Sequence, residues 1–353
     1  MTANQISRRK PPFPVDSGLR RYLERYGRLS EVPVDYEDLL DFREYYPVED
    51  SPAARGGSWL TLVYDSERLR VVNRALCLAY SAMKTDGDIS VMEHLSVARV
   101  DFCEFGNSQP FRIRIVNHFN DNHDHFYVKR ADASRIFGLE LEHILSPNRM
   151  GYMVRGDTLV EEHIAGVPGD QFMRQHLGRA GLNRVRIAKE FVKFNERCFV
   201  RLLGDMRSQN YVVDITPDFE DEQYRIRAID FDQQSYEGPC NHYFPYLWTN
   251  NSPIVDMVRE LLNNATLRQY RHEERTLMAR RLRASRSRYD HLNRCMRDAD
   301  ISTAEKIRQL ADELAEHHRT LRFGACRTMG ELLDRHLEVC LARAVRQLYQ
   351  MQA

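Results

Sequence analysis

The stretch FRIRIVNHFNDNHDHFYVKR, residues 111–130, decides the fold class of this 353-residue chain. Its first half alternates apolar and charged side chains, and Ile113 and Ile115 each follow an arginine. This period of two is typical of a strand that buries one face. The run NDNH in the middle has the composition of a turn. The stretch therefore predicts two successive strands, over residues 111–119 and 125–130.

The elements around this stretch extend the pattern in both directions. Residues 66–84 carry apolar side chains near the 3.6-residue period of a helix, and residues 97–105 have the composition of a strand. Residues 132–145 predict another helix, and residues 151–164 predict two strands around a Gly-Asp turn. A long helix is expected over residues 182–203. Between the first and last of these helices the predicted order is β-β-β-α-β-β.

Two short polar segments follow the long helix. In GDMRSQN, residues 204–210, Arg207 comes two positions and Asn210 five positions after Asp205. The second segment, IDFD, residues 229–232, comes after a predicted hairpin and adds two carboxylates. Together they supply the groups that hold a nucleoside triphosphate through Mg²⁺ and aim a hydroxyl at its γ-phosphate.

These segments resemble the catalytic loop and the metal-binding segment of the protein-kinase-like superfamily, near its aminoglycoside-phosphotransferase and small-molecule-kinase branch. The resemblance implies that Asp205 accepts or orients the proton of the attacking hydroxyl and that Asn210 binds Mg²⁺. It implies that Arg207 contacts the transferring phosphoryl group. Asp230 corresponds to the first residue of the D-F-G segment and is implied as a Mg²⁺ ligand. Asp232 replaces the glycine and could be a second ligand.

The chain departs from the family pattern at Leu203, where relatives have a histidine that braces the loop. Plainer interpretations of the same residues exist. Asp205 could end a helix and cap a turn. Asp230 and Asp232 could flank a buried phenylalanine as ordinary residues at a strand end.

A lysine in the N-terminal half completes the implied nucleotide site. Lys129 follows three apolar residues and resembles the V-A-I-K lysine that pairs with the α- and β-phosphates. Burying an unpaired lysine is costly, so a carboxylate partner is expected on the next helix. Glu140 is favoured for that role, and Glu142 is the alternative. The plainer interpretation is that Lys129 or Arg130 ends an edge strand.

Two further segments are implied to contact the nucleotide. Glu162 and Ile164 belong to an E-x-I-x-G stretch that resembles the hinge between the lobes of small-molecule kinases, where backbone groups pair with adenine. Gly106 and Asn107 lie in the turn between the first two strands of the β-β-β-α-β-β core, and their backbone amides could cradle phosphate. No G-x-G-x-x-G motif accompanies them.

The predicted fold class is α+β, with the two-lobed protein-kinase-like fold that the resemblance implies. We expect a β-rich small lobe over residues 97–165 and a helical large-lobe core over residues 166–253. Helical regions over residues 17–96 and 254–353 flank this core, and residues 1–16 form a flexible arm.

Composition limits the other classes of function. Lys plus Arg and Asp plus Glu both number 51, so net charge does not favour nucleic acid or an anionic membrane. No apolar run reaches the length of a transmembrane helix, about 18 residues. The N-terminus lacks the apolar segment of a secretory signal, and the seven cysteines are widely spaced. These features predict a cytoplasmic protein with reduced thiols. The thirteen histidines show no zinc spacing.

The predicted function is ATP- and Mg²⁺-dependent transfer of the γ-phosphoryl group to a hydroxyl of a protein or a small molecule. Two alternatives remain open at this point: a pseudokinase that binds nucleotide as a regulatory or scaffold protein, and a nucleotidyltransferase that uses the same site. The arginine-rich segment over residues 268–288 suits either a solvated helical face or docking of an acidic or phosphorylated acceptor.

Overall fold

The computed structural model describes residues 10–48, 59–84, 89–104, 107–219 and 222–350. These residues divide into two compact units. The sheet unit comprises residues 10–133 and 150–163, and the helical unit comprises residues 134–149 and 164–350. The fold class is α+β, as predicted, with one seven-stranded antiparallel sheet and eleven α-helices in the described part of the chain.

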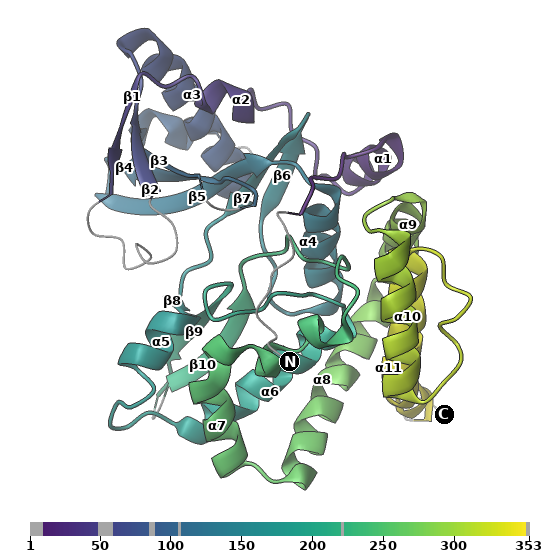
Figure 1. Ribbon diagram of the computed structural model, residues 1–353. Coiled ribbons are helices and arrows are strands. Elements are labelled where there is room, and N and C mark those ends of the chain that lie inside the picture. Colours follow the sequence, from purple (N-terminus) through teal and green to yellow (C-terminus); the bar gives the residue numbers. More distant parts are fainter. Residues whose placement is uncertain (1–9, 49–58, 85–88, 105–106, 220–221, 351–353) are drawn as a thin grey trace. The chain divides into compact units, whose positions relative to one another are not determined.

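The seven-stranded sheet of the sheet unit has the order β1-β2-β3-β4-β5-β7-β6 (Figure 1). Its strands are β1 (Glu44–Pro47), β2 (Trp59–Val63), β3 (Leu95–Cys103), β4 (Phe111–Asn117), β5 (Asn122–Arg130), β6 (Tyr152–Arg155) and β7 (Thr158–Glu162). The predicted hairpin over residues 111–130 is confirmed, and Ile113 on β4 lies opposite Phe126 on β5. Both side chains are fully buried, as the alternation on β4 requires.

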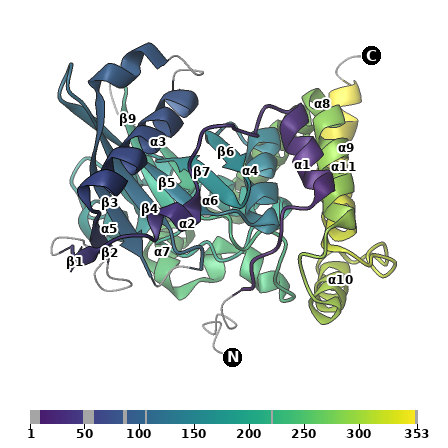
Figure 2. The ribbon, with the colours of Figure 1, turned by 90° about the horizontal axis from the view of Figure 1, so that it is seen from above.

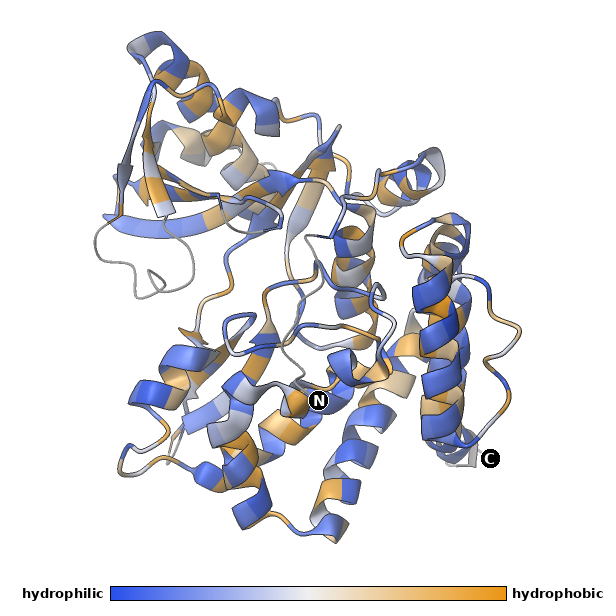
Figure 3. Cartoon of the chain, viewed as in Figure 1, coloured by the Kyte–Doolittle hydropathy of each residue, from blue (hydrophilic) through white to orange (hydrophobic). Residues whose placement is uncertain are grey.

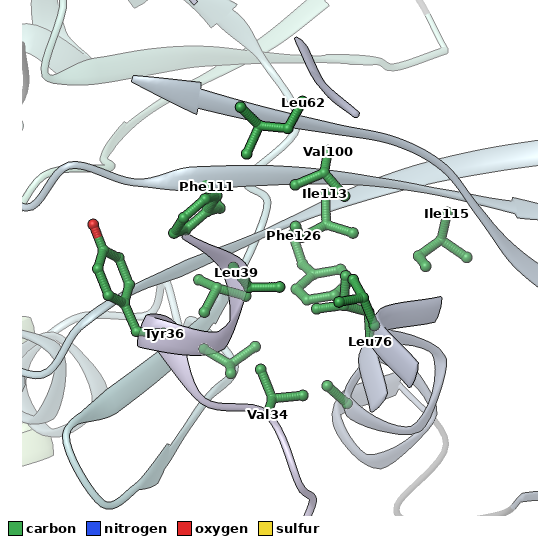
Figure 4. Packing of buried hydrophobic residues seen from close by; sticks show 14 of the residues in the cluster. Val34, Tyr36, Leu39, Leu62, Leu76, Val100, Phe111, Ile113, Ile115 and Phe126 are labelled. Atoms are coloured by element: carbon green, nitrogen blue, oxygen red, sulfur yellow. The ribbon is translucent and has the colours of Figure 1, made fainter. Parts of the chain in front are cut away.

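Helices cover one face of this sheet and close its core. They are α2 (Tyr36–Leu39), α3 (Ser66–Lys84) and the 3₁₀ turn η1 (Ile89–His94), while α1 (Ser17–Arg25) precedes them in the chain. Helix α3 has the predicted bounds and packs across β3 and β4 (Figure 2). Its Leu76 points toward Phe126, and Leu39 of α2 lies beside them (Figure 4). The apolar period of α3 thus faces the apolar side of the sheet.

Strands β1 and β2 are a correction to the prediction that residues 17–96 are helical. Leu60 and Leu62 of β2 are buried, and Leu60 lies opposite Phe102 of β3. Strand β1 pairs with β2 at the edge of the sheet and is exposed along its whole length. The five residues of β2 gave too short a pattern to predict from sequence, and pairing with β3 stabilises the strand.

The helical unit contains the remaining elements. Its α-helices are α4 (Ala133–Leu145), α5 (Gly169–Gln175), α6 (Arg184–Val200), α7 (Ser252–Leu261), α8 (Asn264–Ala284), α9 (Arg286–Asp298), α10 (Ala304–His318) and α11 (Met329–Gln350). A three-stranded antiparallel sheet has the order β10-β9-β8, from β8 (Val167–Pro168), β9 (Tyr211–Pro217) and β10 (Glu222–Ala228). Three 3₁₀ turns follow: η2 (Cys240–Tyr243), η3 (Pro245–Leu247) and η4 (Thr249–Asn251).

Helix α6 is the centre of this unit, because α7, α8 and β10 all pack against it. The last seven residues of α6, Phe194 to Val200, are all buried. Helix α7 carries hydrophobic residues on one side and hydrophilic residues on the other, as Figure 3 shows. Helix α4, which was expected in the small lobe over residues 97–165, belongs instead to the helical unit. No helix among the described residues combines the length and apolar composition that a membrane crossing needs.

We expect Leu76→Ala to destabilise the protein by about 2–5 kcal/mol, because it removes a fully buried side chain and leaves a cavity against the sheet. Urea denaturation measures this change. Leu69→Ala, on the same helix but 45% exposed, is the matched control and should change the free energy of unfolding much less. Equal losses for both variants would contradict the assigned core.

Candidate active site

The loop that carries Asp205 starts with a sharp turn at the end of α6. Leu202 and Asp205 have φ angles of 55° and 56°, in the left-handed region. Such a conformation costs a non-glycine residue about 1–3 kcal/mol and is characteristic of functional loops. Backbone hydrogen bonds join this loop to residues 233–242: Ser235 N to Leu202 O (2.8 Å), Gly204 N to Gln233 O (3.1 Å) and Asp205 N to His242 O (3.3 Å).

Three predicted site residues meet at the Asp205 carboxylate. Arg207 lies with Nε 2.8 Å from Oδ1 and donates a hydrogen bond from Nη2 to Oδ2 over 2.9 Å. Asn210 donates from Nδ2 to the backbone oxygen of Asp205 over 2.7 Å and to its Oδ2 over 3.3 Å. The five-residue spacing therefore closes a compact loop, with the aspartate held from two sides.

The environment of Asp205 brings the pKa of its carboxyl group closer to neutral pH. Burial raises its pKa to about 6, because the charged carboxylate loses water. The Arg207 guanidinium opposes the shift, and the negative charge of Asp230 adds to it. A carboxyl group with a pKa near 6 can both accept and release a proton close to neutral pH.

The second segment is held by a buried arginine on α4. Nη1 of Arg135 lies 2.9 Å from Oδ1 of Asp230 and 2.5 Å from Oδ1 of Asp232. The Asp232 backbone N–H also donates to Oδ1 of Asp230, over 3.1 Å. Arg135 is 1% exposed, so its charge must be neutralised by these carboxylates.

Asp230 and Asp232 differ in the exposure of their side chains. The Asp230 side chain is 35% exposed and that of Asp232 is 10% exposed. Oδ2 of Asp230 and Oδ1 of Asn210 have no hydrogen-bond partner among the described residues. The backbone N–H of Ile229 donates to Asn210 O over 3.0 Å, which joins the two segments. Two unpaired oxygens thus lie on neighbouring stretches of chain.

Two acidic residues of α4 that were considered as lysine partners pair with arginines of the helical unit. Glu140 is fully buried, and its carboxylate receives both Nε and Nη2 of Arg288, each over 2.9 Å. Glu142 pairs with the buried Arg201, whose pKa is lowered to about 9 by burial. Glu140 belongs to the helical unit and Lys129 to the sheet unit. The pairing of these two residues therefore stays a prediction.

Lys129 is buried on β5, in the middle of the sheet. Its Nζ lies 2.6 Å from Oε2 of Glu161, which is on the neighbouring strand β7 and is 1% exposed. Strand β5 is bonded on both sides, by β4 and β7, so the alternative that Lys129 ends an edge strand is wrong. Its ammonium also lies 5.4 Å from the Tyr127 ring. This ion pair gives the buried lysine a carboxylate partner, but the carboxylate comes from the neighbouring strand β7 and not from the next helix, where it was expected.

The other implied nucleotide contacts lie where the chain changes units or at a turn. Glu162 ends β7, and its N–H donates to Gly151 O over 2.9 Å. Ile164 is buried and is the first residue after β7 to belong to the helical unit. Asn107 is exposed in the turn between β3 and β4, whereas Gly106 lies outside the described residues.

Sequence reasoning missed Arg135 and Glu161, although each had a detectable signal. Arg135 precedes the apolar pair Ile136 and Phe137 on a predicted helix, and Glu161 follows Val160 on a predicted strand. A charge within an apolar run implies a buried partner. The identity of that partner depends on contacts that are distant in sequence: 95 residues separate Arg135 from Asp230.

No protein-family model matches this chain, and a search of curated proteins finds no match either.

We expect Arg135→Leu to destabilise the protein by about 3 kcal/mol or more, because it leaves the nearly buried Asp232 and the partly exposed Asp230 without their counter-charge. Urea denaturation tests this, and Arg135→Lys should recover part of the loss. Arg308→Leu removes an exposed arginine from the surface pair with Glu305 and should leave the unfolding midpoint unchanged. An unchanged midpoint in Arg135→Leu would show that the ion pairs of Arg135 with Asp230 and Asp232 contribute nothing to stability.

Proposed function

We propose that this chain is an ATP- and Mg²⁺-dependent phosphotransferase that moves the γ-phosphoryl group to a hydroxyl of a protein or a small molecule. One observation carries the proposal. The loop with Asp205 and Asn210 and the segment with Asp230 meet in the helical unit, and Asp230 is close enough to raise the pKa of Asp205. A base, a cation and oxygen ligands within one site are what phosphoryl transfer needs.

In this proposal, Asp205 orients the acceptor hydroxyl and takes its proton. Burial keeps its pKa near 6, so the carboxylate is ionised at neutral pH and still basic enough to hold the proton. Arg207 pairs with this carboxylate and has a guanidinium that can bind phosphate oxygens bidentately. Arg207 would then stabilise charge on the transferring group while it holds Asp205 in place.

The donor set of the site fits Mg²⁺, which prefers oxygen ligands and keeps several waters. Asp230 Oδ2 and Asn210 Oδ1 are the oxygens available to it, and Asp232 could be a second carboxylate ligand that Arg135 holds in position. When bound, the ion would neutralise the β- and γ-phosphate oxygens. Arg135 holds Asp230 and Asp232 in position through its ion pairs with both carboxylates.

The remaining parts of the proposal concern the nucleotide and its surroundings. The sheet unit would be the small lobe of a kinase-like fold and the helical unit its large lobe. Lys129 would bind the α- and β-phosphates, the backbone near Glu162 and Ile164 would pair with adenine, and the turn with Gly106 and Asn107 would cover phosphate. All seven cysteines are free thiols, which suits the proposed location in the reducing cytoplasm.

A nucleotide-binding regulator without transfer is the second candidate, and a specific observation favours it. Arg207 already neutralises Asp205, and Arg135 already neutralises Asp230 and Asp232. A site whose carboxylates are paired in this way can hold its shape without Mg²⁺ or turnover. Kinetics and binding therefore have to be measured separately.

We expect Asp205→Asn to lower kcat by about 10²–10⁴-fold while ATP still binds, because a general base acts in the transition state. In the unmutated protein, kcat should rise about tenfold per pH unit at acidic pH and level off near pH 6, where Asp205 becomes ionised. Turnover of labelled ATP, measured across this pH range with each acceptor class, gives both results.

Asp214→Asn, on β9, is the matched control for these kinetics and should leave kcat unchanged. Turnover that survives in Asp205→Asn would remove this residue from the reaction. Calorimetry that shows Mg²⁺-dependent ATP binding without any turnover would select the regulatory candidate. No nucleotide binding at all would remove both.

Asp230→Asn should weaken Mg²⁺-ATP binding by about tenfold or more, because it removes the accessible carboxylate. Asp232→Asn should weaken it less, since Asp232 is nearly buried against Arg135. Titration calorimetry with and without Mg²⁺ measures the difference, and thermal denaturation checks that both variants fold. An Asp232 effect larger than the Asp230 effect would reverse the assigned roles.

A further inference from the structure

An apolar pocket of about 190 Å³ lies between three helices of the helical unit, α6, α7 and α8. Hydrophobic side chains from all three helices line it. They are Phe191, Val192, Val255 and Val258, which are buried, and Leu267, which is partly exposed. An apolar cavity of about 150 Å³ is already large enough to bind benzene. The pocket can therefore hold an apolar body of roughly six to eight carbons.

Two side chains in the lining, Asn195 of α6 and Tyr246 of η3, carry hydrogen-bonding groups. Asn195 is 5% exposed, and its amide oxygen accepts the backbone N–H of Tyr246 over 3.2 Å. Because an N–H can only donate, the oxygen must face Tyr246, which leaves the Nδ2 group over. Within the described ranges, neither Nδ2 of Asn195 nor the Tyr246 hydroxyl has a hydrogen-bond partner. A donor on so buried a side chain is costly unless a ligand or water accepts from it.

Arg271 of α8 also lines the pocket and brings a positive charge to these donors. Burial raises the pKa of the Tyr246 hydroxyl, and the charge of Arg271 opposes that rise, so the two groups are close. Nε of Arg271 lies 3.9 Å from Oε2 of Glu196, which is too far for a hydrogen bond. Glu196 pairs instead with Arg275, over 2.5 Å. The Arg271 guanidinium forms no hydrogen bond with any residue that the structure describes, and its side chain is 47% exposed.

Arg259 of α7 is the second arginine in the lining. It lies 3.2 Å from Asp256, and both side chains of this pair are mostly exposed, at 73% and 68%. An exposed pair of this kind contributes little, so Arg259 can exchange it for another anion. The three arginines of these contacts face two carboxylates, those of Asp256 and Glu196, so one positive charge is left over. The charge beside the pocket therefore favours an anionic ligand.

We propose that this pocket binds a small carboxylic acid with an apolar body, in its ionised form. The apolar body would lie between α6, α7 and α8. The carboxylate would pair with Arg271, whose planar fork of donors matches its two oxygens, and would accept hydrogen bonds from Asn195 Nδ2 and the Tyr246 hydroxyl. Mostly apolar walls with a few polar groups that orient the ligand are typical of small-molecule sites.

Other classes of ligand use only part of this lining. An uncharged apolar molecule would leave the arginines and the buried Asn195 donor without an acceptor. A compact anion such as phosphate would leave the apolar walls in contact with water. None of the residues predicted for the nucleotide site lines the pocket, so the inference does not depend on the proposed phosphotransferase activity.

The experiment titrates the full chain by calorimetry with butanoate, hexanoate, octanoate and octan-1-ol. We expect octanoate to bind, and the affinity to rise about fourfold for each buried methylene group in the series. Octanol should bind at least about tenfold more weakly than octanoate, because it cannot pair with Arg271. Methyl resonances of Val255 and Val258 should shift when octanoate is added. Phenylacetate has the same charge, and its affinity relative to octanoate shows whether the pocket prefers an aromatic or an aliphatic acid.

Arg271→Gln should weaken octanoate binding by about tenfold or more and leave octanol binding unchanged. Arg268→Gln is the matched control, because Arg268 is an exposed arginine of the same helix that does not line the pocket. It should bind octanoate as the unmutated protein does. Leu267→Trp, at a partly exposed position, should fill the pocket and abolish binding of both octanoate and octanol. Thermal denaturation checks that each variant is folded.

Three results would overturn the proposal. The first is a folded protein that binds neither octanoate nor phenylacetate at millimolar concentration. The second is octanol binding as tight as octanoate binding, which would leave the arginines without a role. The third is an equal loss of octanoate binding in Arg268→Gln and Arg271→Gln, or full binding in Leu267→Trp, since either would place the acid outside this pocket.

Discussion

The candidate site depends on the buried charge of Arg135. A guanidinium that is 1% exposed cannot stay in the protein interior without carboxylates beside it, and Asp230 and Asp232 provide them. This contact joins α4 to the segment after β10. Two further contacts join the same two parts of the chain. Ser134 Oγ donates to Gln234 O over 2.8 Å, and a Cβ on Gly138 would come within 2.9 Å of Phe231 Cβ. Only glycine permits that approach of α4.

Buried arginine–carboxylate pairs recur through the helical unit. Arg197 lies between Glu190 and Glu274, at 2.8 and 3.3 Å, and is held in its charged form by them despite burial. Arg275 pairs with the buried Glu196. Such pairs are costly to break, because removing one partner leaves an isolated buried charge.

Local periodicity was sufficient to predict most of the fold. The hairpin over residues 111–130, helix α3 and helix α6 each extend over several periods, and the structure confirms all three. Strands β1 and β2 were missed because their stability comes from pairing along the sheet edge and not from a local pattern. The assignment of α4 to the helical unit was missed for the same reason: contacts of Arg135 and Gly138 with residues about 95 positions later decide it.

In the candidate site, too, local contacts were predictable from sequence and distant contacts were not. Spacing in sequence was enough to bring Asp205, Arg207 and Asn210 together, because five residues of loop can close on themselves. It could not show that Asp230 already has a cationic partner, or that the arginine-rich segment after α7 is partly internal, with Arg275 paired to Glu196. Both facts depend on contacts between side chains that are far apart in the sequence.

The strained turn at Leu202 and Asp205 connects these observations. Residues 233–235 hold the turn from one side through backbone hydrogen bonds, and Arg135 fixes that segment through Asp232. Phe199 holds it from the other side, where its carbonyl oxygen accepts hydrogen bonds from Leu202 and from His336 of α11. A left-handed leucine persists only when its surroundings over-determine it. The position of the Asp205 carboxylate is therefore a property of α4, α6 and α11 together, and not of the seven-residue loop alone.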